Sequence, residues 1–172
     1  DFRRSGGNGA YTTTPHFGVG DAIANPDAEG IDQDVLAGLT ASAVVDNSGI
    51  IDVQATADAS VPTFAPDDFD SDGTPNRAEA NATATGINQN VDAGDGLLVT
   101  EAGILASAFF NNTATAQLNV DALAIAVGDT ASAEALAFGV YQAAGVDDEV
   151  LEATARVVND GLIDVGAQAT AT

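Results

Sequence analysis

Small or hydrophobic residues alternate with polar ones over long stretches of the chain. In 54–59, 81–85, 131–138 and 168–172, alanine occupies every second position or nearly so. A period of two indicates β-strands, because successive side chains of a strand point to opposite faces. Alanine is a poor strand former in an open sheet, so its use here indicates inward positions that are too crowded for longer side chains.

Two short signatures recur along the chain. The first, Gly-Ile/Val-x-Gln, begins at Gly30, Gly86 and Gly139. The second, Asn-x-Gly-x-Ile-Asp-Val, lies at 47–53 and 159–165, with a degenerate copy within 106–113. Self-similarity of this kind is typical of proteins whose units stack on one another, and Asn-x-Gly supplies the tight turns that corners need. We therefore predict an all-β fold, a β-solenoid resembling a parallel β-helix and built from irregular repeats. Alanine is expected in its narrow layers, and Ile, Val, Leu and Phe in the wider ones.

The signatures predict how the chain is divided. Repeats cover 28–172, with a loop insertion at about 61–80, whereas 1–27 holds no copy of the unit. We expect 1–27 to be an N-terminal cap, or a strand exchanged with a neighbouring molecule. The variable copy length leaves the coil register open. Residues 148–158 also fit a short amphipathic helix, which is the competing prediction for that stretch. The chain stops within an Ala-Thr run that elsewhere leads into the first signature, so a continuation is expected there.

Charge narrows the range of partners. Among 172 residues there are 26 acidic and four basic ones, for a formal net charge of −22. Nucleic acids and anionic membranes both attract clustered positive charge, so neither is expected as a partner. No apolar run is long enough for membrane insertion. The absence of Cys, Met and Trp suits long exposure outside a cell.

One motif within the insertion carries metal-binding chemistry. Oxygen-bearing residues from position 68 onwards match the spacing of an EF-hand calcium loop, with Gly73 at the sharp turn. Ca²⁺ takes six to eight oxygen ligands, which a chain that wraps the ion can deliver. The predicted calcium ligands are Asp68, Asp70, Asp72, Thr74, Asn76 and Glu79. The alternative is a solvated acidic turn that binds no metal.

The chain has few residues from which a catalytic site or another kind of metal site could be built. His16 is the only histidine, which leaves almost nothing for a catalytic triad or a histidine-rich metal site. Paired carboxylates such as 67/68 and 147/148 arise by chance in so acidic a chain, and we do not expect an enzyme. Glycosylation triplets begin at Asn81 and Asn111, and their use depends on the source of the protein.

The combination of Asn-x-Gly-x-Ile-x-Val with Ala-x-Ala-x-Ala over most of 28–172 resembles the repeats of large bacterial secreted surface proteins. The similarity is to autotransporter adhesins and proteins of the filamentous-haemagglutinin type. It implies a secreted β-solenoid that acts as a stalk, adhesin or fibre. We expect a structural subunit of an extracellular filament or surface stalk, stabilised by calcium, that self-associates end to end through open solenoid edges. The alternative is a calcium-dependent adhesin module that binds a glycan or a protein.

Overall fold

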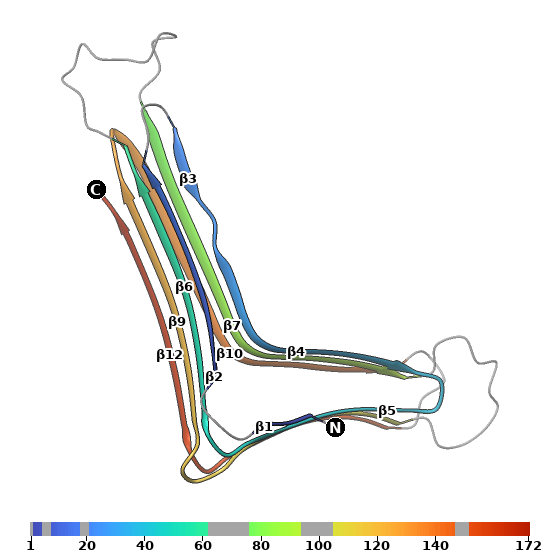
Figure 1. The fold of residues 1–172 in the computed structure, drawn as a ribbon. Helices are drawn as coiled ribbons and strands as arrows, with labels where there is room; N and C mark the ends of the chain where they lie inside the picture. The colour runs from blue at the N-terminus through green and yellow to red at the C-terminus, as the bar shows by residue number, and fades with distance from the viewer. Residues whose placement is uncertain (1, 5–7, 18–20, 62–75, 94–104, 147–151) are drawn as a thin grey trace.

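The computed structural model describes residues 2–4, 8–17, 21–61, 76–93, 105–146 and 152–172 (Figure 1). All regular elements in these ranges are β-strands. They are β1 (Phe2–Arg4), β2 (Asn8–Phe17), β3 (Ala22–Ala24), β4 (Asp27–Ala37), β5 (Thr40–Asn47), β6 (Ile50–Ser60), β7 (Arg77–Ala93), β8 (Leu105–Asn112), β9 (Gln117–Val127), β10 (Thr130–Val146), β11 (Glu152–Asn159) and β12 (Leu162–Ala171).

The strands form three parallel sheets that run along one axis. Sheet A has the order β1-β5-β8-β11, and sheet B has the order β12-β9-β6-β2. In sheet C, β7 lies between β10 on one side and the successive strands β3 and β4 on the other. The chain visits the sheets in the order C, A, B, so β3–β6 make a first coil, β7–β9 a middle coil and β10–β12 a last coil. The prediction of an all-β solenoid is confirmed.

Seen along the axis, each coil traces an L (Figure 1). In the long arm, sheet B faces the first part of the sheet C strands, and in the short arm, sheet A faces their second part. The two arms meet at an elbow where the sheet C strands bend.

The bend coincides with the first sequence signature. In β7, inward-facing residues occupy even positions up to Ala84 and odd positions from Ile87 onwards, so the alternation shifts by one residue at Gly86. A Cβ on Gly86 would lie 2.5 Å from the carbonyl oxygen of Gly139 and 2.7 Å from Val120 Cγ2. The strands approach so closely at the elbow that only glycine fits between the neighbouring backbones.

The core differs between arms and elbow, as the alternating pattern predicts. One buried cluster of the short arm consists of alanine with Val91 as its one larger fully buried residue. Larger buried side chains, such as Phe110, Ile87 and Leu118, occupy positions close to the elbow signature and to the corner between sheets A and B. Alanine therefore permits thin arms, and the long aliphatic and aromatic residues fill the wider space between them.

The structure also settles three details that the sequence left open. Strand β7 begins at Arg77, so the last residues of the predicted insertion, 77–80, belong to sheet C. The helical alternative for 148–158 is wrong from residue 152, where β11 pairs with β8; residues 148–151 lie outside the described part. The coil register is resolved, because equivalent glutamines stand 56 and 53 residues apart and equivalent asparagines 65 and 47 apart.

Candidate functional site

The glutamines of the first signature form a ladder along the axis at the elbow. Gln89 Nε2 donates to Gln33 Oε1 at 2.7 Å, and Gln142 Nε2 donates to Gln89 Oε1 at 2.6 Å. Each glutamine also donates to a backbone carbonyl of the facing sheet A strand, at 3.3–3.4 Å. Gln89 and Gln142 each donate both amide N–H groups, one to a glutamine of the neighbouring coil and one to sheet A. The ladder therefore ties the coils to one another and sheet C to sheet A.

The asparagines of the second signature form another ladder at the corner between sheets A and B. Asn47 Nδ2 donates to Asn112 Oδ1 at 2.8 Å, and Asn112 Nδ2 donates to Asn159 Oδ1 at 2.7 Å. Each donor amide also bonds, at 3.0 Å, the carbonyl of the first residue of the next sheet B strand. This ladder donates towards the last coil, whereas the glutamine ladder donates towards the first coil, so the two run in opposite directions.

The acidic residues are arranged so that carboxylates do not stack. In the described strand pairings, no Asp or Glu stands opposite another Asp or Glu. Several first-coil aspartates instead accept a hydrogen bond from a middle-coil asparagine. These pairs are Asn88–Asp32, Asn90–Asp34 and Asn111–Asp46, at 3.1, 3.3 and 3.2 Å. Like charges directly opposite one another destabilise a sheet, so this interleaving lets a chain of charge −22 form closely stacked coils.

The last coil exposes core positions that are buried in the coils beneath it. Val165 pairs with Val120, which pairs with Val53. The two lower valines are fully buried, but Val165 is 43% exposed. Among the described strands, none pairs with the outer side of β10, β11 or β12. Backbone groups and inward-facing apolar side chains of these three strands thus lie open towards one face, which we call the last-coil face (β10, β11 and β12). An open sheet edge of this kind is a template for a further strand.

The opposite end of the solenoid is built differently. Strands β1 and β2 continue sheets A and B beyond the first coil, whereas β3 and β4 are the outermost described strands of sheet C on that side. Pro15 lies within β2 and Pro26 lies between β3 and β4. Proline has no N–H to donate to a neighbouring strand and is one device by which proteins blunt a sheet edge.

The predicted calcium loop falls mostly outside the described residues. Asp68, Asp70, Asp72 and Thr74 lie there, and only Asn76 and Glu79 are described. The Asn76 side chain is 3% exposed, and its Oδ1 has no hydrogen-bond partner among the described residues. The Glu79 carboxylate forms an ion pair with Arg77 and accepts a hydrogen bond from Asn81 Nδ2 at 2.9 Å. The described part of the chain contains no cluster of three or more His, Cys, Asp or Glu suited to a metal ion.

The acceptor asparagines of the two glycosylation triplets, Asn81 and Asn111, lie in strands β7 and β8. Asn81 Nδ2 donates to Asn25 Oδ1 at 3.0 Å as well as to Glu79, and Asn111 donates to Asp46. A glycan on either nitrogen would disturb these bonds between coils.

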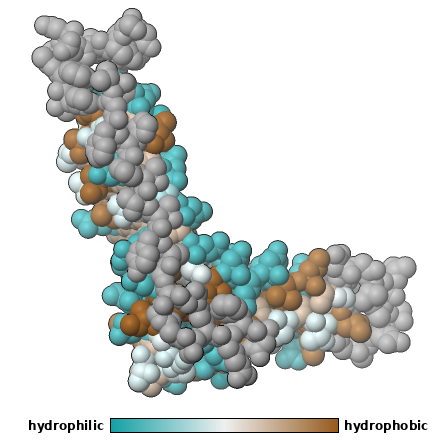
Figure 2. Space-filling model, viewed as in Figure 1, coloured by the Kyte–Doolittle hydropathy of each residue, from teal (hydrophilic) through white to brown (hydrophobic). Residues whose placement is uncertain are grey.

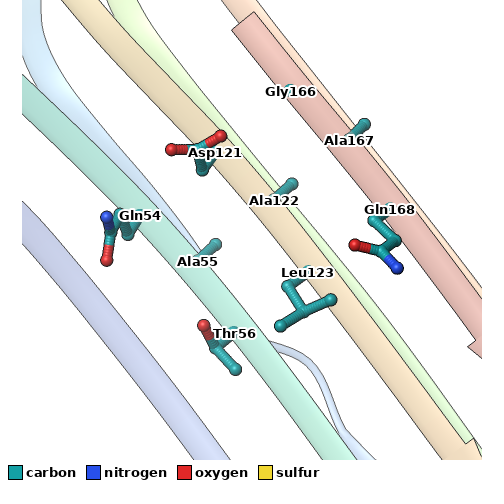
Figure 3. A pocket seen from close by; sticks show the side chains of 9 residues that line it. All are labelled: Gln54, Ala55, Thr56, Asp121, Ala122, Leu123, Gly166, Ala167 and Gln168. Atoms are coloured by element: carbon teal, nitrogen blue, oxygen red, sulfur yellow. The ribbon is translucent and has the colours of Figure 1, made fainter.

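Two surface depressions span all three coils. One, of about 460 Å³, lies on sheet B, where the side chains of Gln54, Asp121 and Gln168 stand around it (Figure 3). The missing side chain of Gly166 opens this depression, and a Cβ there would lie 2.7 Å from Asp121 Oδ1. The second, of about 300 Å³, lies on sheet C and is lined by Glu29, Thr85, Asn88, Phe138 and Tyr141.

Sequence reasoning identified the recurring glutamines and asparagines but not their ladders, and it missed both depressions. The sequence did contain one signal for the depression on sheet C. In the third copy of the first signature, Phe138 precedes Gly139 and Tyr141 follows it, so one aromatic residue lies on each side of the bend.

Comparisons with known proteins add no relative. No protein-family model, curated protein or solved structure matches the chain. No helix in the described residues has the length and apolar character needed to cross a membrane.

Proposed function

We propose that the protein is a structural subunit of an extracellular filament or surface stalk, in which copies stack end to end along the solenoid axis. The observation that carries this proposal is the last-coil face, where core positions such as Val165 are exposed. The hydrophobic effect favours covering such positions, and the unpaired backbone groups of three parallel strands favour a partner that presents strands in the same register. The acidic, cysteine-free composition suits a location outside the cell.

A second copy of the chain has the complementary hydrogen-bonding polarity. If its first coil lies on the last-coil face, Gln33 Nε2 of that copy meets Gln142 Oε1, and Asn159 Nδ2 meets Asn47 Oδ1. Both ladders then continue in their existing directions. The columns defined by the observed register place only one carboxylate pair in contact, Asp164 beside Asp52 of the second copy.

This arrangement requires β1 and β2 of the second copy to leave sheets A and B, which is the strand exchange expected from the sequence. If β1 and β2 of the second copy instead stay in place, they cover β11 and β12 of the first copy. Sheet C then lacks a strand between β10 of the first copy and β3 and β4 of the second. The two arrangements differ in axial repeat. Neighbouring strands are about 4.8 Å apart, so three coils per copy give about 14 Å and four levels per copy give about 19 Å.

Electron microscopy and sedimentation velocity over a range of protein concentrations test the proposal. We expect fibres with one of these axial repeats, and association that increases with concentration. Val165→Asn should prevent association, whereas Leu136→Asn, at a position equally exposed (42%) but on the outer face of sheet C, should not. Monomers of the parent at the highest concentrations, with and without calcium, would overturn the filament.

Calcium is proposed as a brace for the segment between β6 and β7. The buried, unpartnered Oδ1 of Asn76 supports a ligand at that place, while Glu79 would have to exchange its ion pair with Arg77 for the metal. Bound calcium should stabilise the fold by about 2.7 kcal/mol at a hundredfold excess over Kd, with a Kd on the order of 10⁻⁴ to 10⁻³ M. Chelation should therefore lower the melting temperature of the parent, and lower it much less in a variant with Asp70→Ala and Asp72→Ala. Equal shifts in the two proteins would identify the loop as a solvated acidic turn.

The second candidate function is an adhesin module that binds a glycan or a protein. The depression on sheet C favours it, because two exposed aromatic side chains and a carboxylate line the same hollow, and ligand sites combine apolar walls with a few polar groups.

A further inference from the structure

The bend of sheet C creates a groove on its outer, concave side. The observed register stacks Glu29, Thr85 and Phe138 in one column before the bend. After the bend, Asp32, Asn88 and Tyr141 form a second column. The depression of about 300 Å³ lies between these columns. We call it the elbow groove, and define it by Glu29, Thr85, Asn88, Phe138 and Tyr141.

One end of the elbow groove is aromatic. Phe138 and Tyr141 both belong to the last coil and are 48% and 57% exposed. Their partners in the middle coil are the smaller Thr85 and Asn88, so the groove deepens next to the two rings. The faces of aromatic rings carry partial negative charge and attract cations.

The other end of the elbow groove is acidic. Asn88 Nδ2 donates to Glu29 Oε1 at 3.2 Å and to Asp32 Oδ1 at 3.1 Å. The amide thus directs its hydrogen atoms to the carboxylates, while a carboxylate oxygen can accept more than one bond. Figure 2 shows hydrophilic residues along the concave side of the elbow in this view of the molecule. The polar groups at this end are mainly acceptors, and they suit a ligand that donates hydrogen bonds or carries positive charge.

The chain supplies no described cation to this groove. Arg77 pairs with Glu79 at the start of β7, and the Arg156 guanidinium lies 5.7 Å from the ring centroid of Phe109 on sheet A. The latter contact is the same kind of cation–aromatic interaction that the groove offers to an external group.

We propose that the elbow groove binds an organic cation, an alkylammonium or a guanidinium group. The cation lies at the level of Thr85 and Asn88, one strand spacing of about 4.8 Å from the acidic end and the same distance from the aromatic end. Cation–aromatic attraction acts within about 6 Å of a ring centroid, so both ends contribute. The net charge of −22 adds long-range attraction for positive ligands. This inference rests on the second candidate function, a binding module, and is independent of filament formation.

The test is a titration monitored by amide chemical shifts in two-dimensional NMR, at a protein concentration where the chain is monomeric. The probes are choline for the alkylammonium group, agmatine for the guanidinium group and a neutral methyl hexoside. We expect choline or agmatine at 150 mM NaCl to shift the signals of Thr85, Asn88, Phe138 and Tyr141, with the hexoside causing no shift. The cation that binds with the lower Kd shows whether the groove prefers an alkylammonium or a guanidinium group.

Variants separate this site from diffuse attraction to an acidic surface. Tyr141→Ala and Phe138→Ala should each weaken binding about tenfold, the size expected for one cation–aromatic contact, and Glu29→Gln about threefold, as expected for an exposed ion pair. The matched control Asp58→Asn removes an outward carboxylate from sheet B and should leave the affinity unchanged. The proposal is overturned if cations bind equally well to the aromatic variants. It is also overturned if the hexoside binds in the groove and the cations do not, an outcome that would keep the adhesin function and change its ligand to a glycan.

Discussion

The middle coil and the last coil repeat the same pattern, but they differ in their surroundings. The middle coil has strands on both sides in all three sheets, and its inward-facing residues such as Val120 and Ile87 are fully buried. Among the described strands, the last coil has a neighbour on one side only, and its corresponding residue Val165 is 43% exposed. In a solenoid, therefore, the same inward residue stabilises the fold to an extent set by the number of neighbouring coils.

Substitutions at the elbow glycines should show the largest difference between the two coils in the free energy of unfolding that is lost. Gly86→Ala would place a methyl group 2.5 Å from the Gly139 carbonyl oxygen and 3.0 Å from Leu118. At Gly139 the nearest atom is Val165 Cγ2, at 2.9 Å, and that side chain has room to move. We expect Gly86→Ala to lower the free energy of unfolding by about 3 kcal/mol and Gly139→Ala by less than half of that, measured by urea denaturation. Equal losses would show that contacts within one coil, rather than stacking, require glycine.

Truncation of the inward-facing valines should show a smaller difference between the two coils in the stability that is lost. Val120→Ala removes two carbons from a fully buried site and should cost about 2 kcal/mol, from lost burial together with the cavity left behind. Val165→Ala should cost under about 1 kcal/mol in the monomer, because its side chain is already in contact with solvent. If the filament forms, the cost at Val165 should rise towards that at Val120, and its failure to rise would contradict stacking on this face.

The glutamine ladder gives a third comparison. Gln89 bonds to Gln33, to Gln142 and to a backbone carbonyl, whereas Gln142 has one glutamine neighbour among the described residues. Gln89→Ala leaves half-buried polar partners without their bond and should cost about 1–3 kcal/mol. Gln142→Ala should cost less, and thermal unfolding followed by circular dichroism would rank the two. A larger loss at Gln142 would indicate that the elbow of the last coil is held by contacts other than the ladder.

The smallest loss of stability is expected in a column of sheet B where an asparagine separates two aspartates. Asn119 stands between Asp52 of the first coil and Asp164 of the last coil. Asn119→Asp would place three carboxylates in one column and should cost about 0.5–1 kcal/mol at neutral pH, with most of the loss recovered in 1 M NaCl. Asn119→Ser, which keeps the site uncharged, is the control. A loss that does not respond to salt would assign the effect to the missing amide rather than to repulsion.

Local regularities in the sequence were sufficient to predict the strands, the corners and the solenoid. The alternating alanines mark inward positions in β6, β7, β10 and β12, and Asn-x-Gly marks the turn between sheets A and B. These features depend on side-chain size and backbone freedom at single positions, which a linear pattern records directly. The Gly-Ile-x-Gln signature was also recognised as a repeat, although the bend that it produces was not foreseen.

Which residues face one another across coils was decided by the tertiary structure. The loops that join the sheets differ in length, so Asn47 meets Asn112 and then Asn159 at unequal separations along the chain. No fixed period in the sequence can bring these residues together. The elbow groove has the same origin, because Glu29 and Tyr141 line one depression only through the stacking of three coils and the bend of sheet C. Sequence alone determined the kind of strand each segment forms, and the register between coils determined the ladders, the spacing of charge and the groove, since each requires atoms from separate coils to lie within a few ångströms.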